Sequence, residues 1–171
     1  MANIKLEQGE FQHIPPGNIV DTGALGPCVG VIIYDTSKKE AYAGHFVDCE
    51  IQGLDKMIKE AVSNFNQVDK LEFYAAGNFI NTEDKEQCDY ELQDRVFVKN
   101  MLNEYNFLEQ NTYISWGSKI FNPDLNIWAN LIFNVDTAEN ILEVNLHNNL
   151  TDIIKTIYTG DIRRAPKNFS I

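Results

Sequence analysis

The sequence predicts an α+β fold with antiparallel or mixed β-sheets and two main helices. A continuous β-branched run, typical of a strand buried on both faces, covers Val29–Tyr34. Apolar residues recur at helical spacing over Leu54–Phe65. The expected elements follow the order strands, helix, strand, helix, strands, which favours α+β over a doubly wound parallel sheet. The 171 residues suit one domain. We assign it to residues 1–150 and expect 151–171 to be a flexible C-terminal extension.

The first part of the chain predicts a hairpin. Pro15–Asn18 carries turn-forming residues, and Ile19–Val20 follows as a short strand. The buried strand Val29–Tyr34 is separated by a polar connection from the short apolar segment Ala41–Val47. These two segments are therefore expected to pair as antiparallel strands.

Two helices are expected in the middle of the chain. The first covers Leu54–Phe65, and a strand follows at Leu71–Ala75. The stretch 81–89 is expected to be irregular, with an acidic loop over residues 82–89. The second helix is expected over about Tyr90–Tyr105. Its buried side is expected to hold Phe97, Val98, Met101, Leu102 and Tyr105.

Further strands are expected in the last third of the chain, around Thr112–Trp116, Ile127–Val135 and Ile141–Leu146. The pattern at Ile153–Tyr158 predicts a short element without deciding its type. The tail after Gly160 contains basic residues and a proline, and we expect it to be poorly ordered.

The charge balance restricts the partners. The formal net charge is −11, whereas binding phosphates needs clustered Lys and Arg. We therefore expect neither nucleic acid nor an anionic membrane surface as a partner. No apolar run is long enough to span a bilayer, and Met1–Glu10 has no apolar signal-peptide core. We expect no membrane insertion, and a protein that is cytoplasmic or exported without a cleaved signal peptide.

The three cysteines do not predict a disulfide framework, because Cys28, Cys49 and Cys88 are an odd number without regular spacing. At least one thiol is free, as in a reducing compartment. His45 and Cys49, four residues apart, could supply two metal ligands. The chain has no Cys-x-x-Cys pair, and we expect no metal and no other cofactor.

The glycine-rich turn that ends at Cys28 is the segment most informative about chemistry. A cysteine nucleophile needs a base that takes the thiol proton and a third group that orients this base. His45 lies on the strand expected to pair with the strand after Cys28, so the hairpin can bring imidazole and thiol together. Thr22 precedes the turn, and its hydroxyl or its backbone carbonyl can accept the second imidazole N–H and fix the tautomer.

The same turn can supply groups that bind a developing oxyanion, since glycine permits a close backbone approach. We place Gly26 and Pro27 at this substrate or oxyanion position. Asn78 follows a strand beside Gly77 and could line the site, although asparagine is also common in turns.

These residue types also have ordinary structural interpretations. A lone cysteine that opens an apolar strand is usually a small core residue, and a lone histidine at a strand end is usually a structural or surface group. His13 and His147 are expected at the surface because their neighbours are polar. Trp116 and Trp128 are expected in the core or on a sheet face.

Thr22, Leu25-Gly26-x-Cys28 and Gly44-His45-Phe46 resemble the active-site region of the CheD family, the bacterial chemoreceptor glutamine deamidases. That family shows a threonine, a Leu-Gly-Ser-Cys-type turn, an apolar strand, and a strand that ends in histidine and an apolar residue, at matching spacing. The order of elements is similar over roughly Ile4–Leu146, and about thirty residues carry specific motifs.

The resemblance implies a mixed α/β sandwich and a thiol-dependent hydrolase that deamidates glutamine side chains of a protein substrate. Carried over to this chain, Cys28 attacks the carboxamide, His45 acts as base and then acid, and Thr22 orients His45. Pro27 stands where the family usually has serine, and the acidic stretch 82–89 and the tail beyond Thr151 have no clear counterpart. These departures favour a substrate other than a chemoreceptor, as for a bacterial effector. A chemoreceptor-modifying enzyme and a family member that has lost activity stay open as alternatives.

Two other functions stay open at the level of sequence. One is a non-catalytic protein-binding module on the same scaffold, which predicts an inert and buried Cys28. The other is a different cysteine amidase or peptidase, which a deep, narrow pocket would favour over a shallow site open to a protein loop.

Overall fold

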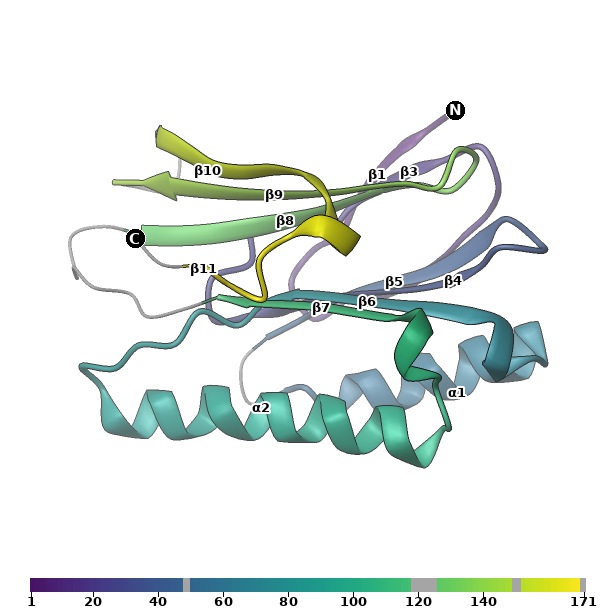
Figure 1. Ribbon diagram of the computed structural model, residues 1–171, viewed down its shortest axis with the longest axis horizontal. Coiled ribbons are helices and arrows are strands. Elements are labelled where there is room, and N and C mark those ends of the chain that lie inside the picture. Colours follow the sequence, from purple (N-terminus) through teal and green to yellow (C-terminus); the bar gives the residue numbers. More distant parts are fainter. Residues whose placement is uncertain (48–49, 118–125, 149–151, 170–171) are drawn as a thin grey trace.

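Two β-sheets lie face to face, and two α-helices cover the outer face of one of them (Figure 1). The computed structural model describes residues 1–47, 50–117, 126–148 and 152–169. Over these ranges the layers are a five-stranded sheet, a six-stranded sheet and the two helices. Both sheets contain parallel and antiparallel pairs. The predicted α+β class, with two main helices and mixed sheets, is therefore confirmed.

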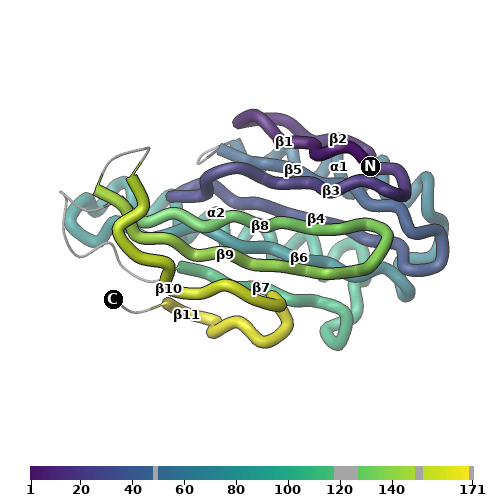
Figure 2. The backbone as a smooth tube through the Cα atoms, turned by 90° about the horizontal axis from the view of Figure 1, so that it is seen from above, coloured from purple at the N-terminus to yellow at the C-terminus, as the bar shows by residue number. Residues whose placement is uncertain are grey.

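The five-stranded sheet has the order β1-β3-β8-β9-β10, and the six-stranded sheet has the order β11-β7-β6-β4-β5-β2. The strands of the first are β1 (Asn3–Lys5), β3 (Ile19–Asp21), β8 (Asn126–Asn134), β9 (Glu139–His147) and β10 (Ile153–Asp161). Those of the second are β2 (Phe11–Ile14), β4 (Val29–Asp35), β5 (Glu40–Phe46), β6 (Leu71–Gly77), β7 (Thr112–Gly117) and β11 (Asn168–Phe169). Seen from above, the strands of the two sheets run in nearly the same direction (Figure 2), as in aligned sheet packing.

The predicted hairpin is present: β4 and β5 pair as antiparallel neighbours along their whole length. On its other side β4 pairs with β6, so β4 is an interior strand of the sheet. Every residue of β4 is buried, because one face of the strand packs against the other sheet and the opposite face packs against the helices. This double burial explains the continuous apolar run.

The first helix, α1 (Gly53–Phe65), forms as the apolar stripe predicts. Its buried residues are Leu54, Met57, Ile58, Ala61 and Phe65. Together with residues of α2 (Lys85–Glu104), they form the core between the helices and the six-stranded sheet. A second core lies between the two sheets. No helix among the described ranges is both long and apolar enough to cross a membrane.

The second helix begins at Lys85 rather than near Tyr90, so the expected loop over residues 82–89 is partly wrong. Asp84 caps the helix, and its side chain accepts a hydrogen bond of 3.0 Å from the N–H of Gln87. Carboxylates are favoured at a helix N-terminus, where they satisfy free N–H groups and face the positive end of the helix dipole. The acidic composition therefore marks a helix start.

Residues 153–169, which the sequence analysis places in an extension, contribute strands to both sheets. β10 pairs with β9 and forms the edge of the five-stranded sheet. A 3₁₀ turn, η3 (Ile162–Arg164), then leads to β11, which pairs with β7 at the edge of the other sheet. Ile162 and Phe169 are buried in the core between the sheets.

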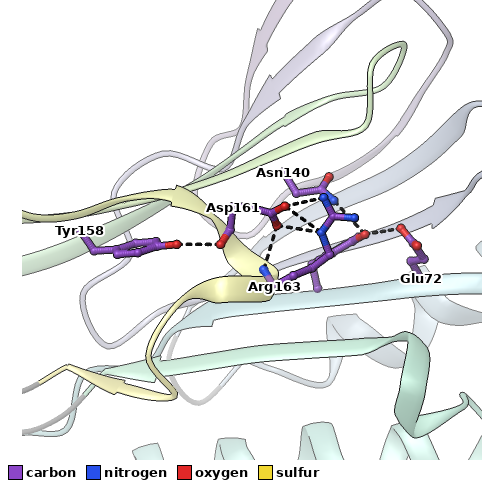
Figure 3. Close-up of polar contacts among 6 residues, drawn as sticks. Glu72, Asn140, Tyr158, Asp161 and Arg163 are labelled. Carbon is purple, nitrogen blue, oxygen red and sulfur yellow. Dashed lines mark hydrogen bonds and ion pairs between the residues drawn. The ribbon is translucent and has the colours of Figure 1, made fainter.

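A polar cluster lies at this edge of the sandwich, around the 3₁₀ turn (Figure 3). Arg163 forms an ion pair with Asp161, whose backbone carbonyl accepts a hydrogen bond of 2.7 Å from the Tyr158 hydroxyl. Nearby, the buried Tyr74 hydroxyl donates to Glu72 and accepts a hydrogen bond of 2.9 Å from Asn140. Burial and the Glu72 carboxylate raise the pKa of Tyr74. Glu72 lies near the start of β6, and Asn78 lies just beyond its other end.

Candidate functional site

The chain crosses from one sheet to the other between β3 and β4, and Cys28 is the last residue of this crossing. The crossing first follows β8. The Thr22 N–H donates to the Leu131 carbonyl at 3.1 Å. Leu25 and Ala129 exchange two backbone hydrogen bonds of 2.7 and 2.9 Å. The segment before Cys28 is therefore held on the five-stranded sheet.

Cys28 and His45 lie on the same face of the six-stranded sheet. Gly30 is directly opposite His45 in the β4–β5 ladder, and Val29 is opposite Phe46. Since side chains alternate along a strand, Cys28 shares the face of Gly30 and is a diagonal neighbour of His45, at about 7–8 Å between Cα atoms. Both side chains are almost closed to solvent, with 6% exposure for Cys28 and 2% for His45.

Glycine at position 30 makes room for the crossing. A Cβ atom there would lie 2.5 Å from Cδ1 of Leu25 and 3.2 Å from Cγ2 of Thr22. Without this side chain, the crossing packs directly on β4, and the backbone of Thr22 comes close to His45.

The imidazole of His45 is oriented by the backbone of Thr22, with 2.7 Å between Nδ1 and the carbonyl oxygen. The predicted contact between these two residues is therefore present, through the carbonyl. The Thr22 hydroxyl is used elsewhere: it accepts a hydrogen bond of 3.0 Å from the Leu131 N–H and donates to the Gly23 carbonyl at 3.2 Å.

This contact assigns the tautomer of His45. A carbonyl oxygen only accepts, so Nδ1 carries a proton and the lone pair of the neutral ring lies on Nε2. Nε2 is buried and has no hydrogen-bond partner among the described residues, Cys28 included. Burial lowers the pKa of His45 from 6.5, and the Thr22 carbonyl and the charges of Asp21 and Glu7 oppose this shift. At neutral pH the ring is thus an uncharged base with an unused lone pair.

The turn after β6 holds the backbone around Cys28. The Asn78 N–H donates to the Cys28 carbonyl at 2.8 Å, and the Phe79 N–H donates to the Gly26 carbonyl at 2.9 Å. Gly77 has φ +98°, and a Cβ atom there would lie 2.4 Å from the Cys28 carbonyl oxygen. The structure therefore brings three predicted site residues, Gly26, Cys28 and Asn78, into one hydrogen-bonded unit, and Pro27 lies half-buried between the first two.

Arg95 is a site residue that the sequence analysis did not identify. It extends from α2 and donates three hydrogen bonds: Nε to Asn78 Oδ1 at 2.5 Å, and Nη2 to the carbonyls of Asn78 and Gly117, both at 2.7 Å. Its guanidinium also lies over the Trp116 ring, 5.5 Å from the centroid. Burial lowers the pKa of Arg95, and Glu91 opposes the shift.

One signal in the sequence points to this part of α2. Glu91 and Asp94 are buried and continue, at helical spacing, the stripe of the buried Val98 and Met101. Charged residues in the line of an apolar stripe indicate specific buried partners, because burying a charge is costly without them. Among these partners, the Asn81 N–H donates to Glu91 at 2.7 Å.

The remaining histidines and cysteines lie elsewhere. The expected surface position of His147 is wrong: it is buried, and its ring packs against Trp128 with centroids 5.1 Å apart. His13 is exposed and pairs with Glu40 at 3.0 Å. Cys88 is half-buried on α2, and Cys49 lies outside the described residues. Within the described ranges, no three His, Cys, Asp or Glu side chains lie close enough together to hold a metal ion.

No protein-family model matches the chain, and no curated protein matches it.

Proposed function

We propose that this chain is a thiol-dependent hydrolase that deamidates glutamine side chains of a protein substrate. The observation that carries the proposal is the state of His45. Its Nδ1–H is held by the Thr22 carbonyl, and its buried Nε2 lone pair is unused, on the face of the sheet that also carries Cys28. The resemblance of the Thr22–Cys28 and Gly44–Phe46 segments to the CheD family supports the choice of glutamine.

The residues of the site suffice for the reaction. Nε2 of His45 takes the proton of the Cys28 thiol, and the thiolate attacks the carbon of the glutamine carboxamide. The imidazolium then returns the proton to the leaving nitrogen, so that ammonia departs and a thioester remains. Water attacks the thioester while Nε2 accepts its proton. The thiolate regains this proton as glutamate is released.

The burial of the site supports a side-chain amide as the substrate. The Cys28 side chain is only 6% exposed, and a peptide bond is flanked by chain on both sides. A glutamine side chain ends in its amide and therefore needs less room around the thiol than a peptide bond does. His45 Nε2 forms no hydrogen bond with the Cys28 thiol. This agrees with the proposal, since catalytic hydrogen bonds often tighten only when substrate is bound.

The test is the pH dependence of iodoacetamide alkylation, followed at each cysteine by mass spectrometry. We expect Cys28 to react rapidly well below pH 8.5, the ordinary thiol pKa, and to slow in His45→Ala. Cys88 in the same molecule is the internal control. A Cys28 that reacts no faster than Cys88, with no effect of His45→Ala, would contradict the proposal. Ammonia release from glutamine-bearing proteins, absent in Cys28→Ala, then tests the substrate.

A second candidate is a non-catalytic protein-binding module, favoured by the burial of Cys28. A groove of about 560 Å³ lies between α2 and β7, where a partner could bind. Its lining includes Leu102, Ile114, Trp116, Lys99 and Lys167. On this alternative, Cys28→Ala leaves partner binding and every other property except thiol chemistry unchanged.

A further inference from the structure

We infer that the side-chain amide of Asn78 donates the hydrogen bond that stabilises the oxyanion in this site, and that Arg95 is the positioning residue that orients this amide. The inference rests on the proposed function and deepens it. It names the donor atom, Nδ2 of Asn78, and a residue on α2 that acts through it.

The orientation of the amide follows from its contact with Arg95. A guanidinium group only donates hydrogen bonds, so the Asn78 atom at 2.5 Å from Nε of Arg95 is the carbonyl oxygen Oδ1. The NH₂ group is therefore directed away from Arg95. A second hydrogen bond, from Nη2 of Arg95 to the Asn78 carbonyl at 2.7 Å, fixes the backbone of the same residue. Side chain and backbone are thus held together by one cation.

Nδ2 is the hydrogen-bonding group of Asn78 that the fold leaves unused. The backbone N–H donates to Cys28, and Oδ1 and the backbone carbonyl accept from Arg95. Asn78 is fully buried, and its Nδ2 has no hydrogen-bond partner among the described residues. An unsatisfied buried donor is unfavourable, and native structures retain few of them. A ligand oxygen at this position would satisfy it.

Asn78 is a direct hydrogen-bonding neighbour of Cys28, because its N–H binds the carbonyl of Cys28 at 2.8 Å. The oxyanion of an acyl transfer forms on the carbon that becomes bonded to the cysteine sulfur. Pro27, the residue before the nucleophile, has no backbone N–H to offer. The Asn78 amide, in the turn after β6, supplies a hydrogen-bond donor that Pro27 cannot.

Arg95 also contributes charge. The guanidinium is partly buried, and its third hydrogen bond, to the Gly117 carbonyl at 2.7 Å, anchors it to the end of β7. A fixed positive charge behind the Asn78 amide polarises its N–H toward a developing negative charge.

The test compares two reactions of the same thiol. Alkylation by iodoacetamide passes through no oxyanion, whereas acylation by p-nitrophenyl acetate forms a tetrahedral oxyanion. Asn78→Gly removes the amide and suits the left-handed backbone at this position, where φ is +52°. We expect the acylation rate of Cys28 to fall about 10²–10³-fold, with the alkylation rate unchanged.

Variants of α2 test the positioning role. Arg95→Lys keeps the charge but replaces two separate donor nitrogens, Nε and Nη2, with a single one, so acylation should fall while alkylation is retained. Lys85→Met, on an exposed position of the same helix, is the matched control and should match wild type in both reactions. Thermal melting checks that each variant is folded. If Asn78→Gly fails to fold, Arg95→Lys still decides the question.

Three outcomes would overturn the inference. They are acylation of Asn78→Gly or Arg95→Lys at the wild-type rate, an equal loss of acylation and alkylation, and a wild-type Cys28 that alkylates rapidly but is not acylated. Failure of the proposed function is distinct, because it leaves wild-type Cys28 no more reactive toward iodoacetamide than Cys88.

Discussion

The imidazole of His45 is held by the backbone of Thr22 and not by its side chain, with Nδ1 and the carbonyl oxygen 2.7 Å apart. Any residue at position 22 has this carbonyl. The threonine hydroxyl instead accepts the N–H of Leu131 on β8, in the five-stranded sheet that the crossing follows. The identity of residue 22 therefore serves the attachment of the crossing to this sheet, and the orientation of His45 follows from the path of the chain.

Thr22→Val should therefore separate stability from reactivity. The variant keeps the carbonyl and leaves the buried N–H of Leu131 without an acceptor, which costs about 1–3 kcal/mol. Urea denaturation should show this loss, and alkylation of Cys28 should stay at the wild-type rate. Thr22→Ser, which retains the hydroxyl, is the control. A loss of reactivity as large as that of His45→Ala would mean that the hydroxyl acts on the imidazole.

Gly77→Ala should disrupt the turn that holds Cys28. The added Cβ meets both a left-handed backbone and the Cys28 carbonyl, and we expect a loss of about 3–5 kcal/mol. Gly9 has a similar φ of +81° but open space around it, so Gly9→Ala should cost only about 1–2 kcal/mol. Chemical denaturation of both variants measures the difference, and equal losses would show that the close approach is unimportant.

The stability of the protein should fall as the pH drops below about 6.5. Burial lowers the pKa of both His45 and His147 from 6.5, so the unfolded chain takes up protons at a higher pH than the folded one. The stabilisation is therefore complete above the unfolded pKa and is lost as the pH falls through the folded values.

Urea midpoints measured between about pH 8 and pH 5.5 test this dependence. His45→Asn and His147→Asn should each flatten part of the slope, and the double variant should flatten it further. A slope that neither substitution changes would assign the dependence to other groups.

The C-terminal segment should contribute to global stability. Phe169 is buried between the sheets, and Phe169→Ala should cost about 3–5 kcal/mol. Ile154 on β10 is 53% exposed, so Ile154→Ala should change stability by less than about 0.5 kcal/mol. Denaturation curves compare the two variants. A Phe169→Ala variant as stable as wild type would mean that residues near the C-terminus are dispensable.

Local patterns sufficed to predict much of the fold. The β4–β5 hairpin follows from two apolar segments around a polar connection, and α1 follows from one apolar stripe. The shared face of Cys28 and His45 could also be anticipated, because a hairpin fixes which residues lie opposite each other across it. These features depend on residues that are close in the sequence.

Features that depend on distant partners could not be predicted. Arg95 resembles an ordinary surface residue of a helix until the carbonyls of Asn78 and Gly117 are brought to it. His147 has polar neighbours in the sequence, but the ring of Trp128 covers it on the adjacent strand. The start of α2 was missed for a different reason, since acidic composition alone does not distinguish a loop from the first turn of a helix.

The pair of hydrogen bonds between Leu25 and Ala129 sets an order of events during synthesis. Leu25 lies three residues before Cys28, whereas Ala129 lies on a strand made much later. Domains generally fold as units during synthesis. On a nascent chain that ends before β8, the crossing has no strand to follow and His45 is not yet held in place. The proposed activation of the Cys28 thiol by His45 would therefore arise only when most of the protein has been translated.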